Sequence, residues 1–137
     1  MKHNVMLTIA SLLSMLFMSF HQADDVVRGM APGGLSNLVP VLFLVIWLYG
    51  TTLVLGDRRS GYVILLVLSL LGSGIPILHM TGSGLVGGDI AGSSGAFFFV
   101  WTLIALGVTT LFSVILSARG LWLLQWGKSR LVQQPEL

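Results

Sequence analysis

The sequence has no cysteine and very little charge. Without cysteine the chain can form no disulfide, and it offers no thiol nucleophile and no thiolate ligand for zinc or an iron–sulfur centre. Charged residues make up only 9% of the 137 residues, against roughly 25% in an ordinary soluble domain, and hydrophobic residues make up 55%. Because so few charges cannot cover a soluble surface, we expect most of this surface to face lipid.

Basic residues are also too sparse for nucleic-acid binding. Seven Lys and Arg stand against five Asp and Glu, and they form no patch that could neutralise several phosphates. The lipid bilayer is therefore the expected partner, and nucleic acid is excluded as one.

Four apolar runs, at residues 5–20, 38–55, 62–80 and 96–118, contain no Asp, Glu, Lys or Arg. Because about 20 apolar residues span the hydrocarbon core as a helix, the runs predict an all-α membrane protein: one small bundle of four transmembrane helices covering residues 1–137. The first run covers only about 24 Å as a helix, so we expect that span to continue to about residue 28. The missing intramembrane carboxylate disfavours a proton-coupled exporter.

The N-terminus also resembles a cleaved signal peptide, with Lys2 before a short apolar core. Ala23 could precede the cleavage site, but His21 would then occupy a position that requires a small residue. We therefore expect the first helix to be retained, and removal of residues 1–23 is the alternative.

Helix boundaries are predicted by glycine, proline and polar residues. Gly29 suits the C-terminal cap of the first helix, and Pro32 prevents its continuation. Ser36 or Asn37 is the expected N-cap of the second helix, which ends at the turn formed by residues 56–61. A glycine-rich loop then joins the third and fourth helices.

The basic residues predict the orientation of the chain. Arg58 and Arg59, in the short turn between the second and third spans, are best placed in the cytoplasm. With both termini cytoplasmic, only Arg28 of the seven basic residues lies outside, as the positive-inside rule requires. The glycine-rich loop is then extracytoplasmic. We predict a multi-pass protein of a bacterial-type cytoplasmic (inner) membrane.

The fourth span is expected to end at Arg119 and Gly120, before an interfacial segment at residues 121–126 and a short C-terminal tail. Small side chains recur at every fourth position of this span. Such a stripe allows another membrane helix to approach closely, which predicts association with a second copy or with a larger membrane complex. The stripe consists of Ala105, Thr109, Ser113 and Ser117.

The residues that could bind a metal or another ligand gather at the predicted outer side. His21 lies three and four residues before Asp24 and Asp25, and both carboxylates lie within reach of Arg28 on one helical face. His79, at the outer end of the third span, is expected at a similar height, and Asp89 lies in the following loop. Imidazoles with a carboxylate are ligands for a metal, and two histidines can hold haem iron.

Charges beyond the end of a span are also expected simply because they cannot enter the hydrocarbon. The sequence therefore favours a non-enzymatic structural or accessory membrane subunit with no catalytic residue and no cofactor. The first alternative is an outer binding site for a metal, haem or small ligand, formed by His21, Asp24, Asp25 and His79. The second alternative is a small transporter or pore.

Overall fold

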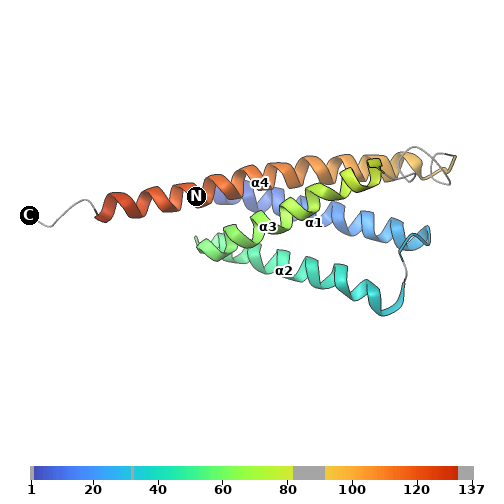
Figure 1. The fold of residues 1–137 in the computed structure, drawn as a ribbon, viewed down its shortest axis with the longest axis horizontal. Helices are drawn as coiled ribbons and strands as arrows, with labels where there is room; N and C mark the ends of the chain where they lie inside the picture. Colours follow the sequence, from blue (N-terminus) through green and yellow to red (C-terminus); the bar gives the residue numbers. More distant parts are fainter. Residues whose placement is uncertain (1, 32, 82–91, 133–137) are drawn as a thin grey trace, which may run out of the picture.

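The computed structural model describes the backbone of residues 2–31, 33–81 and 92–132, and their side chains except at positions 80, 81 and 126–132. In this part of the chain, four long α-helices run back and forth, and all four are long and apolar enough to cross a membrane (Figure 1). This confirms the predicted all-helical, four-span class. The elements in chain order are α1 (Lys2–Val27), the 3-10 helix η1 (Gly34–Asn37), α2 (Leu38–Leu55), α3 (Arg59–Thr81) and α4 (Ala96–Val132).

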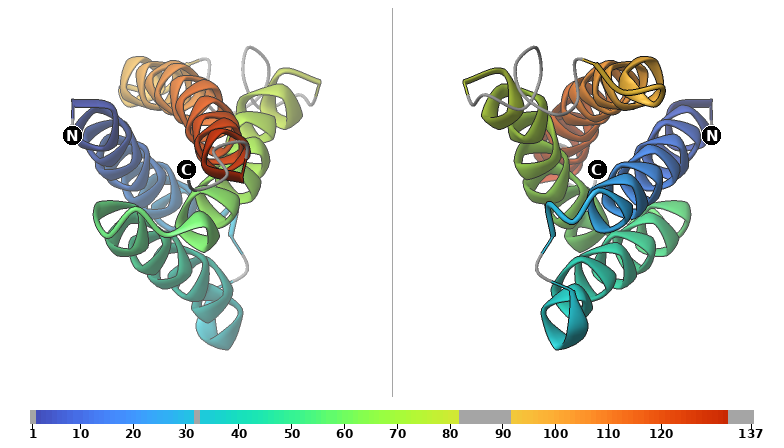
Figure 2. Two further views of the ribbon diagram at one scale, coloured as in Figure 1. Left: turned by 90° about the vertical axis from the view of Figure 1, so that its left-hand side faces the viewer. Right: turned by 90° about the vertical axis from the view of Figure 1, so that its right-hand side faces the viewer.

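The helices are arranged around α4, which packs along both α1 and α3, whereas α2 packs mainly against α3. Seen along the bundle, α2 lies on the side opposite α4 (Figure 2). The buried residues of α2, from Trp47 to Val54, all belong to its second half. Its first half diverges from the bundle, as Figure 1 shows.

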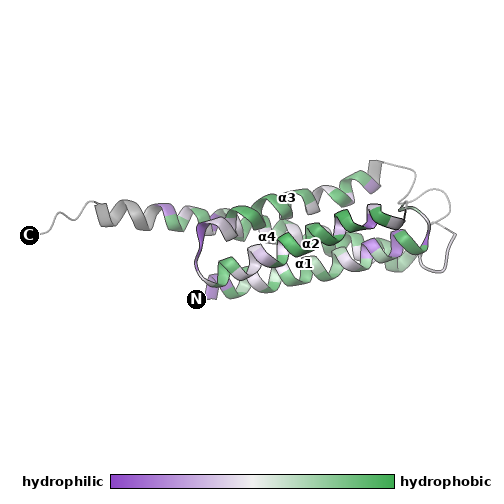
Figure 3. Cartoon of the chain, turned by 90° about the horizontal axis from the view of Figure 1, so that it is seen from below, coloured by the Kyte–Doolittle hydropathy of each residue, from purple (hydrophilic) through white to green (hydrophobic). Residues whose placement is uncertain are grey.

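We call the two ends of the bundle the turn end and the histidine end. The turn end holds the start of α1, the turn Gly56–Arg58 and the start of α3, and the histidine end holds the last turns of α1 and α3 and the start of α4. Hydrophilic residues concentrate toward these ends, and apolar residues cover the middle of the helices (Figure 3). This distribution is consistent with a multi-pass membrane protein.

Two helices end in left-handed caps. Gly29 has φ 69°, and the amide of Met30 donates to the carbonyl of Asp25, which confirms Gly29 as the cap of α1. At the end of α2 the same conformation falls on Asp57, with φ 54°, and the amide of Arg58 donates to the carbonyl of Leu53. The turn is shorter than predicted, because residues 59–61 already belong to α3.

The predicted N-cap of α2 is wrong. Asn37 has a helical backbone conformation and makes no side-chain cap hydrogen bond, and the Ser36 hydroxyl donates backward to the carbonyl of Gly33. Because η1 runs directly into α2, the chain is already helical where a cap would need an extended residue.

Glycines mark the closest helix contacts. A Cβ at Gly50 would lie 2.6 Å from the Ile64 side chain, and one at Gly61 would lie 2.7 Å from the Val54 amide nitrogen. A Cβ at Gly72 would lie 2.9 Å from Thr110. The absence of a side chain therefore sets how closely α3 approaches α2 and α4.

The small-residue stripe lies inside the bundle. Ala105, Ser113 and Ser117 are buried, and Thr109 is half-buried. The hydroxyls of Thr109 and Ser113 donate to carbonyls four residues earlier in α4. Helices of the same chain therefore pack against the stripe. The predicted association with another protein stays a prediction, but these residues no longer support it.

Arg119 and Gly120 do not end the helix, since α4 continues through both to Val132. Gly120 is buried, and a Cβ there would clash with the Tyr62 ring. This glycine thus accommodates an aromatic neighbour. Most of the predicted glycine-rich loop, and residues 133–137 of the tail, lie outside the described residues.

Candidate metal centre

Three metal-ligating side chains converge at the histidine end. His21 and Asp25 lie one turn apart on α1, so their side chains share a face, and His79 comes from the last turns of α3. The Nε2 atoms of the two histidines are 3.2 Å apart, and Nε2 of His21 lies 3.5 Å from Oδ2 of Asp25. One ligand atom from each residue lies within 4.8 Å of the others. The sequence placed these residues at a similar height, and the structure brings them into contact.

The separations of 3.2 Å and 3.5 Å match adjacent ligands of a single ion. With metal–ligand bonds of about 2.0–2.1 Å, two tetrahedral ligands lie roughly 3.3 Å apart. Two imidazoles and one carboxylate then leave one coordination position open for water or a ligand. Axial haem ligands need their nitrogens on opposite sides of the iron, roughly 4 Å apart with the macrocycle between them. The 3.2 Å contact leaves no space for that macrocycle, so the geometry disfavours the haem alternative.

One aromatic ring, that of Phe99, lies against both histidines. The Phe99 ring centroid lies 5.9 Å from that of His21 and 5.4 Å from that of His79, and Phe99 is itself fully buried. His21 is only 4% exposed. Its Nδ1 atom and Oδ1 of Asp25 are buried and have no hydrogen-bond partner among the described residues. Buried polar atoms without a partner need an explanation: ordered water can satisfy Nδ1 of His21, and either water or an ion bound by the Asp25 carboxylate can satisfy Oδ1.

Asp24 serves a different function from Asp25. Its Oδ2 atom accepts a hydrogen bond of 2.6 Å from Nε of Arg28, and the guanidinium also donates to the Ser93 hydroxyl at 3.0 Å. The same guanidinium lies over the Phe99 ring, and a Cβ at Gly95 would clash with it. Arg28 therefore ties the end of α1 to the start of α4, beside the three candidate metal ligands. Asp89, the remaining candidate, lies outside the described residues.

The sequence reasoning missed Phe99, Ser93 and Gly95. Phe99 stands in a run of three phenylalanines that reads as a lipid-facing surface. Nothing in the local pattern distinguishes the one buried ring from its two exposed neighbours, because that distinction depends on how α4 is rotated against α1 and α3.

A second polar network, at the turn end, was also missed. The Asn4 side-chain amide donates to the Val54 carbonyl at 3.2 Å and to Oδ1 of Asp57, and the Tyr62 hydroxyl donates to Oδ1 of Asn4 at 2.6 Å. On the same side, the His3 ring nitrogen lies 3.0 Å from the Leu116 carbonyl oxygen. Together these bonds tie the start of α1 to the other three helices.

No protein-family model matches the chain, and no curated protein or solved structure matches it. The described part of the chain is an all-helical bundle with four helices of membrane-spanning length, and it has a His–His–Asp cluster at one end.

Proposed function

We propose that this protein is a multi-pass membrane protein that binds one divalent transition-metal ion at its histidine end. His21, His79 and Asp25 are the proposed ligands. The observation that carries the proposal is the 3.2 Å approach of two histidine nitrogens from different helices, with a carboxylate oxygen 3.5 Å from one of them. Zinc suits this nitrogen and oxygen set, and other first-row ions compete for it.

The surroundings support a binding site with limited access. The described residues around the ligands include the Phe99 ring and the Asp24–Arg28 ion pair, which fixes the neighbouring turn of α1. Because α1 and α3 hold the ligands on helices, their positions are fixed more precisely than they would be on loops.

The charge distribution gives the proposed orientation. Both termini and the turn end lie in the cytoplasm, as the excess of Lys and Arg there requires, and the metal faces the extracytoplasmic side of a bacterial-type inner membrane. Three protein ligands leave an open position, which favours reversible loading or ligand exchange over a purely structural ion.

The test is metal binding by the full chain purified in detergent and stripped with a chelator. We expect one Zn²⁺ per chain by calorimetry and elemental analysis, and Co²⁺ should give the visible absorption bands of a low-symmetry, four-coordinate site. His79→Gln keeps a hydrogen-bonding side chain but lacks the imidazole, and it should weaken binding by at least the 10–100-fold typical of altering even an outer-shell partner.

The chain supplies a matched control, since its third histidine, His3, lies at the opposite end of the bundle. His3→Gln should bind Zn²⁺ like the unmodified protein. Equal affinities for the His79→Gln and His3→Gln variants would overturn the proposal, as would the absence of stoichiometric metal in the unmodified protein.

The accessory role is the second candidate function, and one observation favours it. The C-terminal part of α4 projects beyond the other three helices (Figure 1), and Trp122 and Leu123 of the same helix are exposed. A membrane partner could pack along this projection. A photo-crosslinker at position 122 should then capture one defined protein in the native membrane, whereas products with lipid alone would argue against a partner there.

A further inference from the structure

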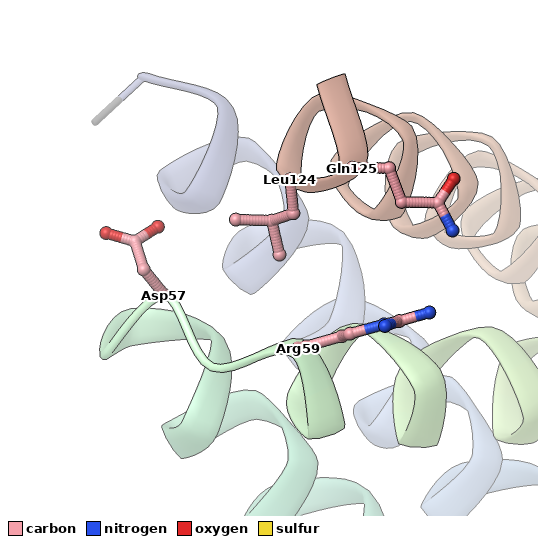
Figure 4. A pocket seen from close by; sticks show the side chains of 4 residues that line it. All are labelled: Asp57, Arg59, Leu124 and Gln125. Atoms are coloured by element: carbon pink, nitrogen blue, oxygen red, sulfur yellow. The ribbon is translucent and has the colours of Figure 1, made fainter. Parts of the chain in front are cut away.

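The turn end contains a cavity that the proposed metal site does not use. Its volume is about 170 Å³, and it lies between the turn after α2 and the last described side chains of α4. In Figure 4 the Asp57 carboxylate and the Arg59 guanidinium lie at opposite edges of this cavity, and Leu124 lies between them. The lining residues are Asp57, Arg59, Leu124 and Gln125.

The two charges of the cavity do not pair with each other. Among the described side chains, the ion pairs within 4.0 Å are His21–Asp25 and Arg28–Asp24, both at the opposite end. Asp57 and Arg59 are only two residues apart, yet the turn directs them to separate edges. A carboxylate and a guanidinium held apart across a small cavity can bind a ligand that carries both opposite charges.

The carboxylate is held in place before any ligand binds. Its Oδ1 atom accepts a hydrogen bond from the Asn4 side-chain amide of α1, and Asn4 is itself held by the Tyr62 hydroxyl of α3, which lies 3.5 Å from the same carboxylate oxygen. The backbone of Asp57 is left-handed, a conformation uncommon for a residue other than glycine.

We infer that this cavity binds the headgroup of a zwitterionic phospholipid with a primary amine, the aminoethyl phosphate class. The ammonium donates hydrogen bonds to Asp57, and the phosphate accepts them from the Arg59 guanidinium, whose planar donors suit phosphate oxygens. Leu124 supplies an apolar contact on the side of the glycerol and acyl chains. Since this end of the bundle borders the apolar spans, lipid headgroups are the charged molecules present there at the highest density.

The charges also discriminate between lipid classes. An anionic headgroup without an amine would place its phosphate near Arg59 but leave Asp57 without a cation. A choline headgroup has no N–H group for the carboxylate, and proteins usually recognise quaternary ammonium through aromatic cages. Among the described residues, the cavity has no aromatic lining residue.

The experiment uses the full chain in detergent, titrated with dioleoyl phosphatidylethanolamine or dioleoyl phosphatidylcholine and followed by native mass spectrometry. We expect the ethanolamine lipid to bind about tenfold or more tightly, the difference typical of a charge-assisted hydrogen bond. Equal binding of the two lipids would overturn the inference. Free phosphoethanolamine that binds as tightly as the lipid would overturn the assignment to a lipid.

Three variants locate the site. Asp57→Asn keeps the shape and tolerates the left-handed backbone, and it should abolish the preference for ethanolamine over choline. Arg59→Gln should weaken binding of both lipids about tenfold. Arg58→Gln changes an adjacent exposed arginine that does not line the cavity, so it should leave the lipid preference unchanged. An Arg58→Gln effect as large as that of Arg59→Gln would indicate general surface charge and overturn the site. These variants lie at the opposite end from His21 and His79 and should leave the metal titration unchanged, so the two proposals fail independently.

Discussion

A single methyl group at Gly61 is expected to destabilise the bundle. A Cβ there would lie 2.7 Å from the Val54 amide nitrogen, 2.8 Å from the Leu53 Cβ and 2.9 Å from the Gly50 carbonyl oxygen. Two of these atoms belong to the α2 backbone, so no side-chain rotation can relieve the overlap. Helices α2 and α3 must then separate, and inserting atoms into a well-packed contact costs about 1–3 kcal/mol.

Gly74 provides the matched control within the same helix. A Cβ at Gly74 would meet no atom within 4 Å, so Gly74→Ala adds the same methyl group to open space. Both substitutions gain the helix propensity of alanine over glycine, roughly 0.8–1 kcal/mol in water. This gain cancels in the comparison, and the difference between the two variants isolates the cost of the helix contact.

The assay is reversible unfolding in mixed micelles of mild detergent and sodium dodecyl sulfate, followed by circular dichroism and tryptophan fluorescence. We expect Gly61→Ala to be less stable than Gly74→Ala by about 1–3 kcal/mol. Equal stabilities for the two variants would refute the reasoning, because they would mean that α2 and α3 do not meet at Gly61.

Three further predictions concern the proposed metal site, a hydroxyl contact between α1 and α2, and the small-residue stripe of α4. Zinc affinity should fall as the pH is lowered toward 5, because protons compete with the ion for its imidazole ligands; a flat calorimetric titration series down to pH 5 would contradict histidine ligation. The Ser11–Thr51 hydroxyl contact, 2.8 Å between α1 and α2, should give a coupling of about 0.6 kcal/mol in a double-mutant cycle with alanine, and a coupling of zero would mean that the contact does not contribute. Ser113→Leu should lower the unfolding midpoint, because Ser113 is fully buried, and it should leave the mass of the folded particle unchanged by light scattering; a change from oligomer to monomer with unchanged stability would restore the stripe as an external interface.

Much of the fold could be predicted from local sequence. The lengths of the apolar runs predicted four helices, because a membrane-spanning helix satisfies its own backbone hydrogen bonds and requires only enough apolar residues in sequence. The second helix was predicted over residues 38–55, where α2 lies, and Gly29 was correctly identified as the cap of α1. The His21–Asp25 and Asp24–Arg28 pairs were predictable for the same reason, since a four-residue spacing on one helix brings the side chains together.

Sequence patterns were ambiguous where a residue contacts a neighbour that is remote in sequence. Gly120 resembles a helix terminator, but it lies inside α4, where it accommodates Tyr62. The stripe from Ala105 to Ser117 resembles an external interface, but most of it is buried against the same chain. In both cases the local pattern indicates a small side chain and a close approach, and it does not indicate which helix approaches.

The sequence by itself therefore determined that four helices form, where α1 is capped, and which ligand types gather at the histidine end. The tertiary structure decided that His79 meets His21 across 58 positions of sequence, that Phe99 closes one side of their site, and that Asp57 and Arg59 face one cavity. The physical reason is that helical contacts within four residues follow from backbone geometry alone. Contacts between helices depend on the rotation of each helix about its axis and on its position along the bundle. Glycine contacts and buried hydroxyls fix these only when all four helices are packed together.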